Sequence, residues 1–271
     1  LEANRQILQV IPKSYTVDDQ SGIIDPVGMN GIRLEVDTHI ITGSTPALKN
    51  LQNAVFRSGI QINDQLIIPL AAARTVLTKK QLEQGVALIN IGAETTGLAV
   101  FQEGRLTYSS ILPLGAGHIT KDLVYGLQTN MDIAEQIKLK YGVARRPNPR
   151  NQHKIDLAEF GGKGVVYRHD IDKIIYARCN EIFTMIAKEI SNVDQNKQLS
   201  AGVVLTGGGA NMPEIAEFVK HYVKLPTVIG TSHKYTGVSD KITDPGYAAA
   251  IGLMLTDMEI PHSGTKGKPL D

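Results

Sequence analysis

The length, composition and charge of the chain restrict its class. It has 271 residues, of which 42% are hydrophobic and 20% are charged, as is typical of a globular chain with one large or two medium-sized domains. Its 28 basic and 27 acidic residues leave a net charge of +1. This balance argues against a nucleic-acid partner, which requires an excess of Lys and Arg. The single cysteine excludes an internal disulfide framework and is typical of a reducing compartment.

The first part of the chain mixes strands with a helix. Short apolar or alternating patterns predict strands over 7–10 and 31–41. Thr45 and Pro46 then predict the start of a helix, with a cap and a proline in its first turn, and Gly59 ends it. The residues expected to face the core from this helix are Leu48, Leu51, Ala54 and Val55.

A short strand over 66–68 and a helix over 70–77 are expected to follow. From Gly85 the pattern changes, and the nearly continuous apolar run 86–91 predicts a strand buried on both faces. The remaining predicted strands cover 98–101, 105–112, 202–205 and 226–229, and the remaining helices cover 118–125, 131–141, 170–190, 213–223 and 247–255. Together these elements favour an α/β protein of several subdomains.

Two glycine-containing turns each follow a predicted buried strand. The first runs from Asn90 through Gly92 to Thr96, and the second covers 206–209. Glycines let backbone N–H groups approach phosphate or ribose oxygens, and the second turn leads into a helix N-terminus, which favours anions. Either turn alone is equally compatible with ordinary turn chemistry. The presence of both favours the binding interpretation.

Glu135 and Lys138 lie three residues apart on the helix predicted over 131–141, so their side chains are neighbours. From the residues alone, a solvated ion pair is the favoured interpretation, ahead of a contact with ribose or adenine. Other catalytic patterns are not found in the sequence. Its seven histidines have no metal-binding spacing, and it contains no G-x-S-x-G motif. Cys179 falls on the apolar stripe of the long helix and is predicted to be a core residue rather than a nucleophile.

Specific stretches resemble a known family. Residues 88–101 resemble the second phosphate loop of the actin, Hsp70 and sugar-kinase superfamily, and residues 202–210 resemble its adenosine motif. Within that superfamily the chain is similar to FtsA, an actin-like bacterial cell-division family, in order and spacing from Ile7 to about Leu255. The stretches that carry this similarity are Val10-Ile11-Pro12 with Tyr15, 25–29, Ala134-Glu135 with Ile137-Lys138, Lys140-Tyr141-Gly142, and 247–253.

The resemblance implies an α/β protein with an actin-like (ribonuclease-H-like) ATPase fold and an incomplete first domain. The N-terminal part of the family and its C-terminal membrane helix are expected to be missing from the chain, which starts at Leu1. The implied division assigns 1–45 to the FtsA-type inserted subdomain, 46–84 to the returning part of the first large subdomain, 85–119 and 200–258 to the second large subdomain, 120–199 to the fourth subdomain, and 259–271 to a disordered tail.

The resemblance also implies a cofactor and a partner. The cofactor would be ATP with Mg²⁺, which makes adenosine contacts the favoured interpretation of Glu135 and Lys138. The implied nucleotide contacts are Gly92, Thr95, Thr96, Glu135, Lys138, Gly207, Gly208 and Gly209. Arg178 matches an arginine in the surface that docks the C-terminal peptide of FtsZ, where it would pair with a carboxylate. A cation lying along the helix surface is an equal alternative for Arg178.

Three departures from the family pattern weaken an enzymatic interpretation. Asn90 stands where the second phosphate loop has an aspartate, Ala93 and Glu94 replace two glycines, and Gly97 replaces the trailing aspartate. The first phosphate loop is not in the chain. Because phosphoryl transfer needs metal and charge on both sides of the phosphate, we expect a weak ATPase at most.

The implied function is a cell-division adaptor. It would bind ATP, self-assemble into filaments, and link FtsZ and other division proteins to the cytoplasmic membrane at the septum, through a C-terminal helix. One alternative is a pilus-assembly scaffold resembling PilM, and another is a small-molecule kinase or ATPase of the same superfamily. The stretch 25–28 favours division over pilus assembly, and Asn90 disfavours the enzyme because it supplies no carboxylate base.

Overall fold

The fold is organised around a five-stranded mixed sheet. The computed structural model describes residues 3–194, 198–232 and 242–259. The strands follow the order β10-β9-β4-β5-β6, in which β4, β5 and β6 form an antiparallel meander and β9 and β10 run parallel to β4. Their bounds are β4 Val86–Ile91, β5 Thr96–Gln102, β6 Arg105–Leu112, β9 Val203–Thr206 and β10 Thr227–Ile229.

Strand β4 is buried along its whole length, as its apolar sequence predicts. Side chains alternate between the two faces of a strand, and both faces of β4 are covered. Ala87, Ile89 and Ile91 belong to the core shared with α4, α6 and α7. Val86 and Leu88 belong to a second core shared with α2 and α8. The helix bounds are α2 Ile68–Val76, α4 Ala116–Leu127, α6 Arg168–Val193, α7 Ile215–Val223 and α8 Ala248–Glu259.

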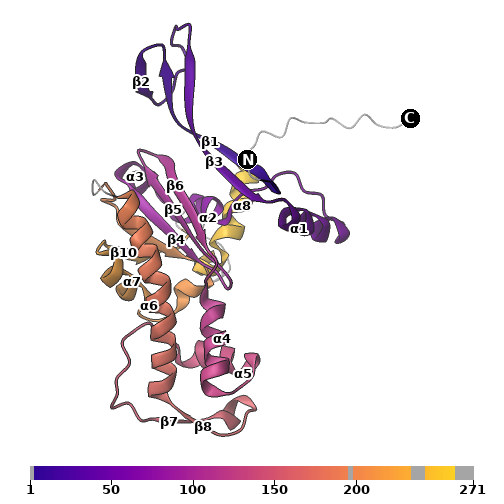
Figure 1. The fold of residues 1–271 in the computed structure, drawn as a ribbon, viewed down its shortest axis with the longest axis vertical. Helices are drawn as coiled ribbons and strands as arrows, with labels where there is room; N and C mark the ends of the chain where they lie inside the picture. The colour runs from indigo at the N-terminus through magenta and orange to yellow at the C-terminus, as the bar shows by residue number, and fades with distance from the viewer. Residues whose placement is uncertain (1–2, 195–197, 233–241, 260–271) are drawn as a thin grey trace.

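A helical region lies beyond one end of the sheet (Figure 1). It contains α4, the lower half of α6, and α5, together with two short strands that pair in antiparallel fashion. Their bounds are α5 Met131–Tyr141, β7 Lys154–Asp156 and β8 Val165–Tyr167, with the 3-10 turn η1 Leu157–Phe160 between the strands. The predicted stripe of α6 is buried from Ile171 to Ile190 and includes Cys179, although Ile174 is only partly buried.

The N-terminal strands project beyond the other end of the sheet (Figure 1). β1 Arg5–Val17 pairs with β3 Leu34–Ser44 over its length and with β2 Gln20–Ile23 near its end. α1 Thr45–Arg57 follows with the predicted start, but its predicted inward face is wrong. No residue of α1, which is described in full, is buried, and Leu51 is 63% exposed. The reason is that α1 lies beside the end of β3, away from both cores.

The strand predicted over 66–68 is also wrong, because Ile67 caps α2 and Ile68 is its first residue. Pro69 fits the first turn of a helix, and α2 is apolar because it packs between the sheet and α8. A further helix, α3 Lys79–Gln84, was not predicted, although Thr78 and Gln81 form a capping box at its start. The predicted tail, apart from Glu259 at the end of α8, lies outside the described residues. Within the described ranges, no helix is both long and apolar enough to cross a bilayer.

Candidate functional site

The two glycine-containing turns emerge at the same edge of the sheet. β4 and β9 are parallel neighbours, with Asn90 opposite Thr206 near their carboxyl ends. The first turn follows β4 and the second follows β9, so the sheet brings them together although they are far apart in the sequence. In α/β proteins, ligands bind beyond the carboxyl ends of parallel strands. This edge of the sheet is therefore the candidate ligand site.

The first turn is fixed to the start of α4 by backbone hydrogen bonds. Ala116 N donates to Gly92 O at 2.8 Å, and Gly117 N donates to Ala93 O at 2.7 Å. A Cβ atom at Gly115 would lie 2.5 Å from Gly92 O, and one at Gly117 would lie 2.8 Å from Ala93 O. Glycines therefore let α4 approach the turn this closely.

The second turn packs directly against the end of β4. Gly207 has a φ of +85°, and a Cβ there would lie 2.5 Å from Ile91 O. A Cβ at Gly209 would lie 2.3 Å from Ile91 Cγ2. Gly208 differs, because a Cβ there would meet no heavy atom within 4 Å. Thus Gly207 and Gly209 are required for packing, while Gly208 faces open space.

Helix α5 supplies the charged pair of the site. Asn130 caps this helix by accepting a hydrogen bond from Ile133 N at 2.9 Å. Lys138 Nζ lies 2.7 Å from Glu135 Oε2 and donates to Thr120 Oγ1 of α4 at 2.9 Å. Thr120 in turn donates to Glu135 Oε2 at 2.6 Å. The Lys138 side chain is only 11% exposed, and that of Glu135 is 43% exposed, so this is not a fully solvated ion pair.

The pKa of Glu135 reflects these contacts. Burial alone would raise it, but the hydrogen bonds from Lys138 and Thr120 outweigh burial and hold the pKa below its ordinary value. Glu135 is therefore ionised at neutral pH, and its charge is compensated by the Lys138 ammonium.

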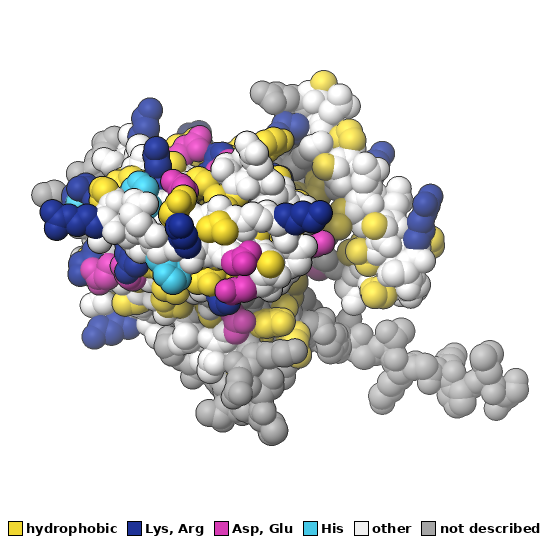
Figure 2. All heavy atoms as spheres, turned by 90° about the horizontal axis from the view of Figure 1, so that it is seen from below, with side chains coloured by type: hydrophobic (Ala, Val, Ile, Leu, Met, Phe, Trp, Pro, Cys, Tyr) yellow, Lys and Arg dark blue, Asp and Glu magenta, His cyan; other side chains and the backbone are white. Residues whose placement is uncertain are grey.

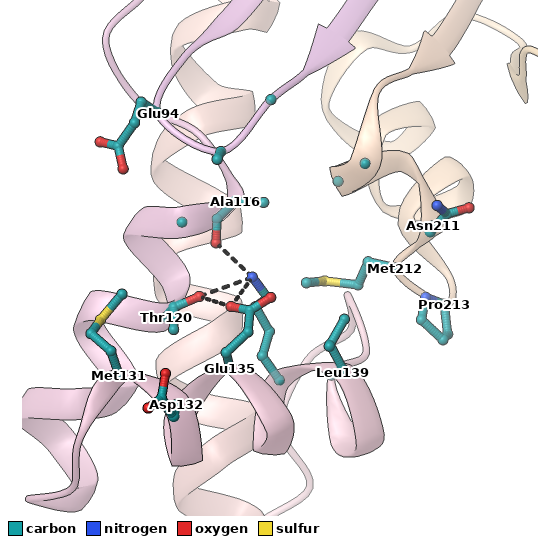
Figure 3. A pocket seen from close by; sticks show the side chains of 17 residues that line it. Glu94, Ala116, Thr120, Met131, Asp132, Glu135, Leu139, Asn211, Met212 and Pro213 are labelled. Atoms are coloured by element: carbon teal, nitrogen blue, oxygen red, sulfur yellow. Dashed lines mark hydrogen bonds and ion pairs between the residues drawn. The ribbon is translucent and has the colours of Figure 1, made fainter. Parts of the chain in front are cut away.

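A cavity of about 600 Å³ lies between these elements. In Figure 3 the two turns, the start of α4 and one face of α5 surround it, and Glu135 and Thr120 lie on its polar wall. Lys138 also lines the cavity. Met212, Leu139 and Pro213 supply apolar surface on another side. The cavity thus combines glycine backbone, one ion pair and an apolar wall.

The structure brings some of the predicted contacts together and separates others from the cavity. Gly92, Glu135, Lys138, Gly208 and Gly209 line it. Three other predicted contacts do not line the cavity. Thr95 is exposed in the first turn, Thr96 is buried and donates to Leu114 O at 2.7 Å, and Gly207 is buried at the start of the second turn. Further lining residues that were not predicted include Ala116, Gly117, Thr120, Met131, Asp132 and Met212.

Arg178 of α6 forms an intramolecular ion pair with Asp122 of α4. Its Nε and Nη2 atoms lie 2.6 and 2.8 Å from the two carboxylate oxygens of Asp122, and Nη1 lies 2.7 Å from Glu181 Oε2. The hydrogen bonds that Arg178 donates to the Asp122 carboxylate raise the pKa of Arg178. A partner carboxylate would therefore have to share or replace Asp122.

Two further observations concern Cys179 and possible metal ligands. Cys179 is buried, which confirms its predicted place in the core, and burial raises the pKa of its thiol to about 12. Within residues 3–194, 198–232 and 242–259, no group of three or more His, Cys, Asp or Glu side chains could hold a metal ion. Figure 2, seen from below, shows Lys and Arg side chains interspersed with acidic, His and hydrophobic ones on that face.

The fold is that of an actin-like protein, as its similarity to solved structures shows. The type IV pilus complex of PilM and PilN aligns with a TM-score of 0.71 at 14% identity, covering 96% of this chain and 68% of that one. MreB5 of Spiroplasma citri bound to AMPPNP aligns with a TM-score of 0.62 at 17% identity, covering 80% of this chain and 65% of that one. At these identities the likeness shows the fold.

Sequence comparison identifies the family. Residues 87–252 match the family "Cell division protein FtsA", and residues 1–42 match "SHS2 domain inserted in FTSA". The chain therefore belongs to the FtsA family of cell-division proteins, which confirms the resemblance.

Individual FtsA proteins are similar over most of this chain. The relative from Neisseria meningitidis is 36% identical, covering 93% of this chain and 61% of that protein. The relative from Bacillus subtilis is 38% identical, covering 92% of this chain and 56% of that protein. The chain thus spans about three fifths of the length of these curated relatives.

Proposed function

We propose that this chain binds an adenine nucleotide in the cavity and acts as a cell-division adaptor. In this role it self-assembles and links FtsZ to the cytoplasmic membrane at the division septum. The observation that carries the proposal is the cavity between the turns after β4 and β9, with Lys138 and Glu135 on its wall. Solved proteins of the same fold include MreB5 bound to AMPPNP and to ADP.

The chemistry of the cavity fits a nucleotide. Within the described residues, the N–H groups of Ala93 and Glu94 donate to no protein acceptor, so the turn can offer them to phosphate oxygens. The open space beside Gly208 admits a ligand close to the backbone. Lys138 and Glu135 offer one cation and one acceptor to ribose or base, and the surface of Met212 and Leu139 suits an apolar base face.

Magnesium would be held mainly by the nucleotide. Mg²⁺ keeps several waters and is commonly bound through substrate phosphates and one or two carboxylates. Asp132 is a carboxylate on the cavity wall that can take part, whereas Asn90 contributes no charge. The ion would screen the phosphate charge, and the residues of this chain would bind and orient the nucleotide.

The positions of the acidic side chains support nucleotide binding without efficient hydrolysis. Asn90 stands at the end of β4, where a carboxylate could activate water. Glu135 is paired with Lys138, and Glu94 is paired with Lys121. A kinase or ATPase remains the alternative, and it predicts robust metal-dependent ATP turnover by the purified chain.

Nucleotide binding can be tested at Gly208. A Gly208→Val substitution adds atoms into open space, so the fold should be retained while the cavity is narrowed. We expect ATP affinity, measured by calorimetry, to fall at least tenfold, with an unchanged circular dichroism spectrum. The control is Ala158→Val at an exposed position of η1, which should leave affinity unchanged. A Gly208→Val chain that binds ATP like the parent would exclude this cavity as the site.

The FtsZ role can be tested through the Arg178 bridge. If the C-terminal peptide of FtsZ supplies a carboxylate to Arg178, then Arg178→Ala should weaken peptide binding. Asp122→Asn should preserve or strengthen it, because it removes the competing intramolecular partner. If Arg178 only holds α4 to α6, both variants should weaken binding alike. A parent chain that does not bind the peptide would favour the alternative of a scaffold resembling PilM.

Self-assembly and membrane attachment are tested separately. Filaments should form in the presence of ATP and be detected by sedimentation and electron microscopy. Because part of the relatives' length lies outside this chain, vesicle binding is best measured on the longest gene product that includes it. Failure of that product to bind anionic vesicles would refute the membrane link.

A further inference from the structure

The first turn carries an acidic side chain beside the cavity. Glu94 lines the cavity and its side chain is 63% exposed. If the cavity binds a nucleotide as proposed, a carboxylate here would repel the phosphate chain unless its charge is compensated. The structure shows such compensation.

The compensating charge comes from α4. Lys121 Nζ lies 3.1 and 2.9 Å from the two carboxylate oxygens of Glu94. His118, three residues earlier on the same helix, places Nε2 4.0 Å from Glu94 Oε2. Its other ring nitrogen, Nδ1, accepts a hydrogen bond from Gly115 N at 3.1 Å. The Nε2 atom of a neutral ring therefore carries the proton and faces the carboxylate.

The relative position of Lys121 and Glu94 does not depend on their ion pair alone. The bonds from Ala116 N and Gly117 N fix the start of α4 to the backbone of the turn. Lys121 follows one helical turn later, which places its ammonium beside Glu94. The lysine is not among the residues that line the cavity, whereas Glu94 is. Lys121 is thus placed to act on a ligand through Glu94 rather than by direct contact.

We propose that Lys121 is a positioning residue that neutralises Glu94 and so allows the first turn to accept a polyphosphate chain. The pair would set the preference of the site for ATP over adenosine. This inference rests on the proposed nucleotide site and adds a residue that the family resemblance did not supply. The proposed indirect role of Lys121 can be distinguished from direct phosphate binding by Lys121. If the role is indirect, removing the charge of Glu94 should make Lys121 unnecessary for ATP binding.

The test measures ATP, ADP and adenosine affinities of the full chain by calorimetry in MgCl₂. In Lys121→Met, ATP affinity should fall by about three- to tenfold, a range set by solvent screening of an exposed pair, while adenosine affinity stays unchanged. In Glu94→Gln/Lys121→Met, ATP affinity should return to the parent value or above. Glu94→Gln alone should bind ATP more tightly, and Lys121→Arg should resemble the parent. High salt should reduce each difference.

Control variants distinguish the proposed role of Lys121 from a purely structural role and from direct phosphate contact. Lys140→Met removes an ion pair between Lys140 of α5 and Glu159 of η1 and should change none of the affinities. Equal loss of ATP and adenosine binding in Lys121→Met would show a merely structural role. A double variant as weak as Lys121→Met would show direct phosphate contact. Either result overturns the inference, as would weaker ATP binding by Glu94→Gln, whose exposed side chain is not needed for folding. A parent chain that binds neither ATP nor adenosine would instead refute the nucleotide site itself.

Discussion

Replacing Lys138 by Met should destabilise the chain by an amount that depends on pH. The substitution keeps most of the apolar stem and removes an ammonium that contacts Glu135, Thr120 and Ala116 O. Hydrogen bonds to charged groups contribute about 1.5–3 kcal/mol, and breaking a fully buried pair costs about 3–5 kcal/mol. Glu135 remains partly hydrated, so its charge is screened. We therefore expect a loss of about 1–2 kcal/mol at pH 7.

The pH dependence follows from the lowered pKa of Glu135. A carboxyl group whose pKa is lower in the folded state stabilises that state at pH values above its unfolded value, here 4.5. The stabilisation is lost as the pH falls through the lower folded pKa, because Glu135 then becomes protonated. The difference between the parent and Lys138→Met should therefore narrow below pH 4.5.

The assay is urea unfolding followed by circular dichroism, from pH 7 down to the acid limit of the parent fold. The double variant Glu135→Gln/Lys138→Met should lose less stability than the two single losses added together, since the residues are coupled. Lys140→Met, which removes an exposed ion pair between the same helix and Glu159 of η1, is the matched control and should have little effect. A loss equal to that of this control, or one that is independent of pH, would refute the reasoning.

Three further predictions concern the packing that supports the site. Gly252→Ala should cost about 1–3 kcal/mol by overpacking, because its Cβ would lie 1.8 Å from Ala71 O between α2 and α8; urea unfolding measures this loss. Asp172→Asn should cost about 3 kcal/mol, since it leaves the largely buried Arg168 without its carboxylate; a loss below 1 kcal/mol would show that water replaces the pair. Cys179, with a pKa of about 12, should resist iodoacetamide at pH 8.5 until denaturant is added, and rapid native labelling, read by mass spectrometry, would contradict its burial.

Much of the fold could be predicted because several elements carry their own local signals. α5 has its predicted bounds, since Asn130 caps it and Gly142 follows its last residue. β4 combines an apolar run with burial on both faces. The apolar triplet 66–68 was misleading because a buried helix and a buried strand look alike over so few residues. The exposed face of α1 depends on where that helix lies, which no local pattern records.

The backbone of the site could be predicted more readily than its side-chain partners. Glycines at 92 and 207–209 mark the turns in the sequence itself. Thr120 could not be identified in this way, because its contact with Glu135 and Lys138 arises only when α4 packs on α5. The pairing of Glu94 with Lys121 likewise depends on the position of α4. Both contacts join residues from different elements, so no helix or strand periodicity in the sequence indicates them.

Two residues in the same turn of α4, Thr120 and Asp122, connect the cavity to the predicted partner surface. Thr120 contacts Glu135 and Lys138 on the cavity wall, and Asp122 holds Arg178 on α6. A shift of α4 on nucleotide binding would therefore change the Arg178 bridge as well. If ATP changes the affinity for the FtsZ peptide by some factor, thermodynamic linkage requires that the peptide change the affinity for ATP by the same factor. Calorimetric titrations in both orders measure the two factors, with Asp122→Asn as the variant in which coupling should fall. Equal peptide affinity with and without ATP would show that α4 stays in place.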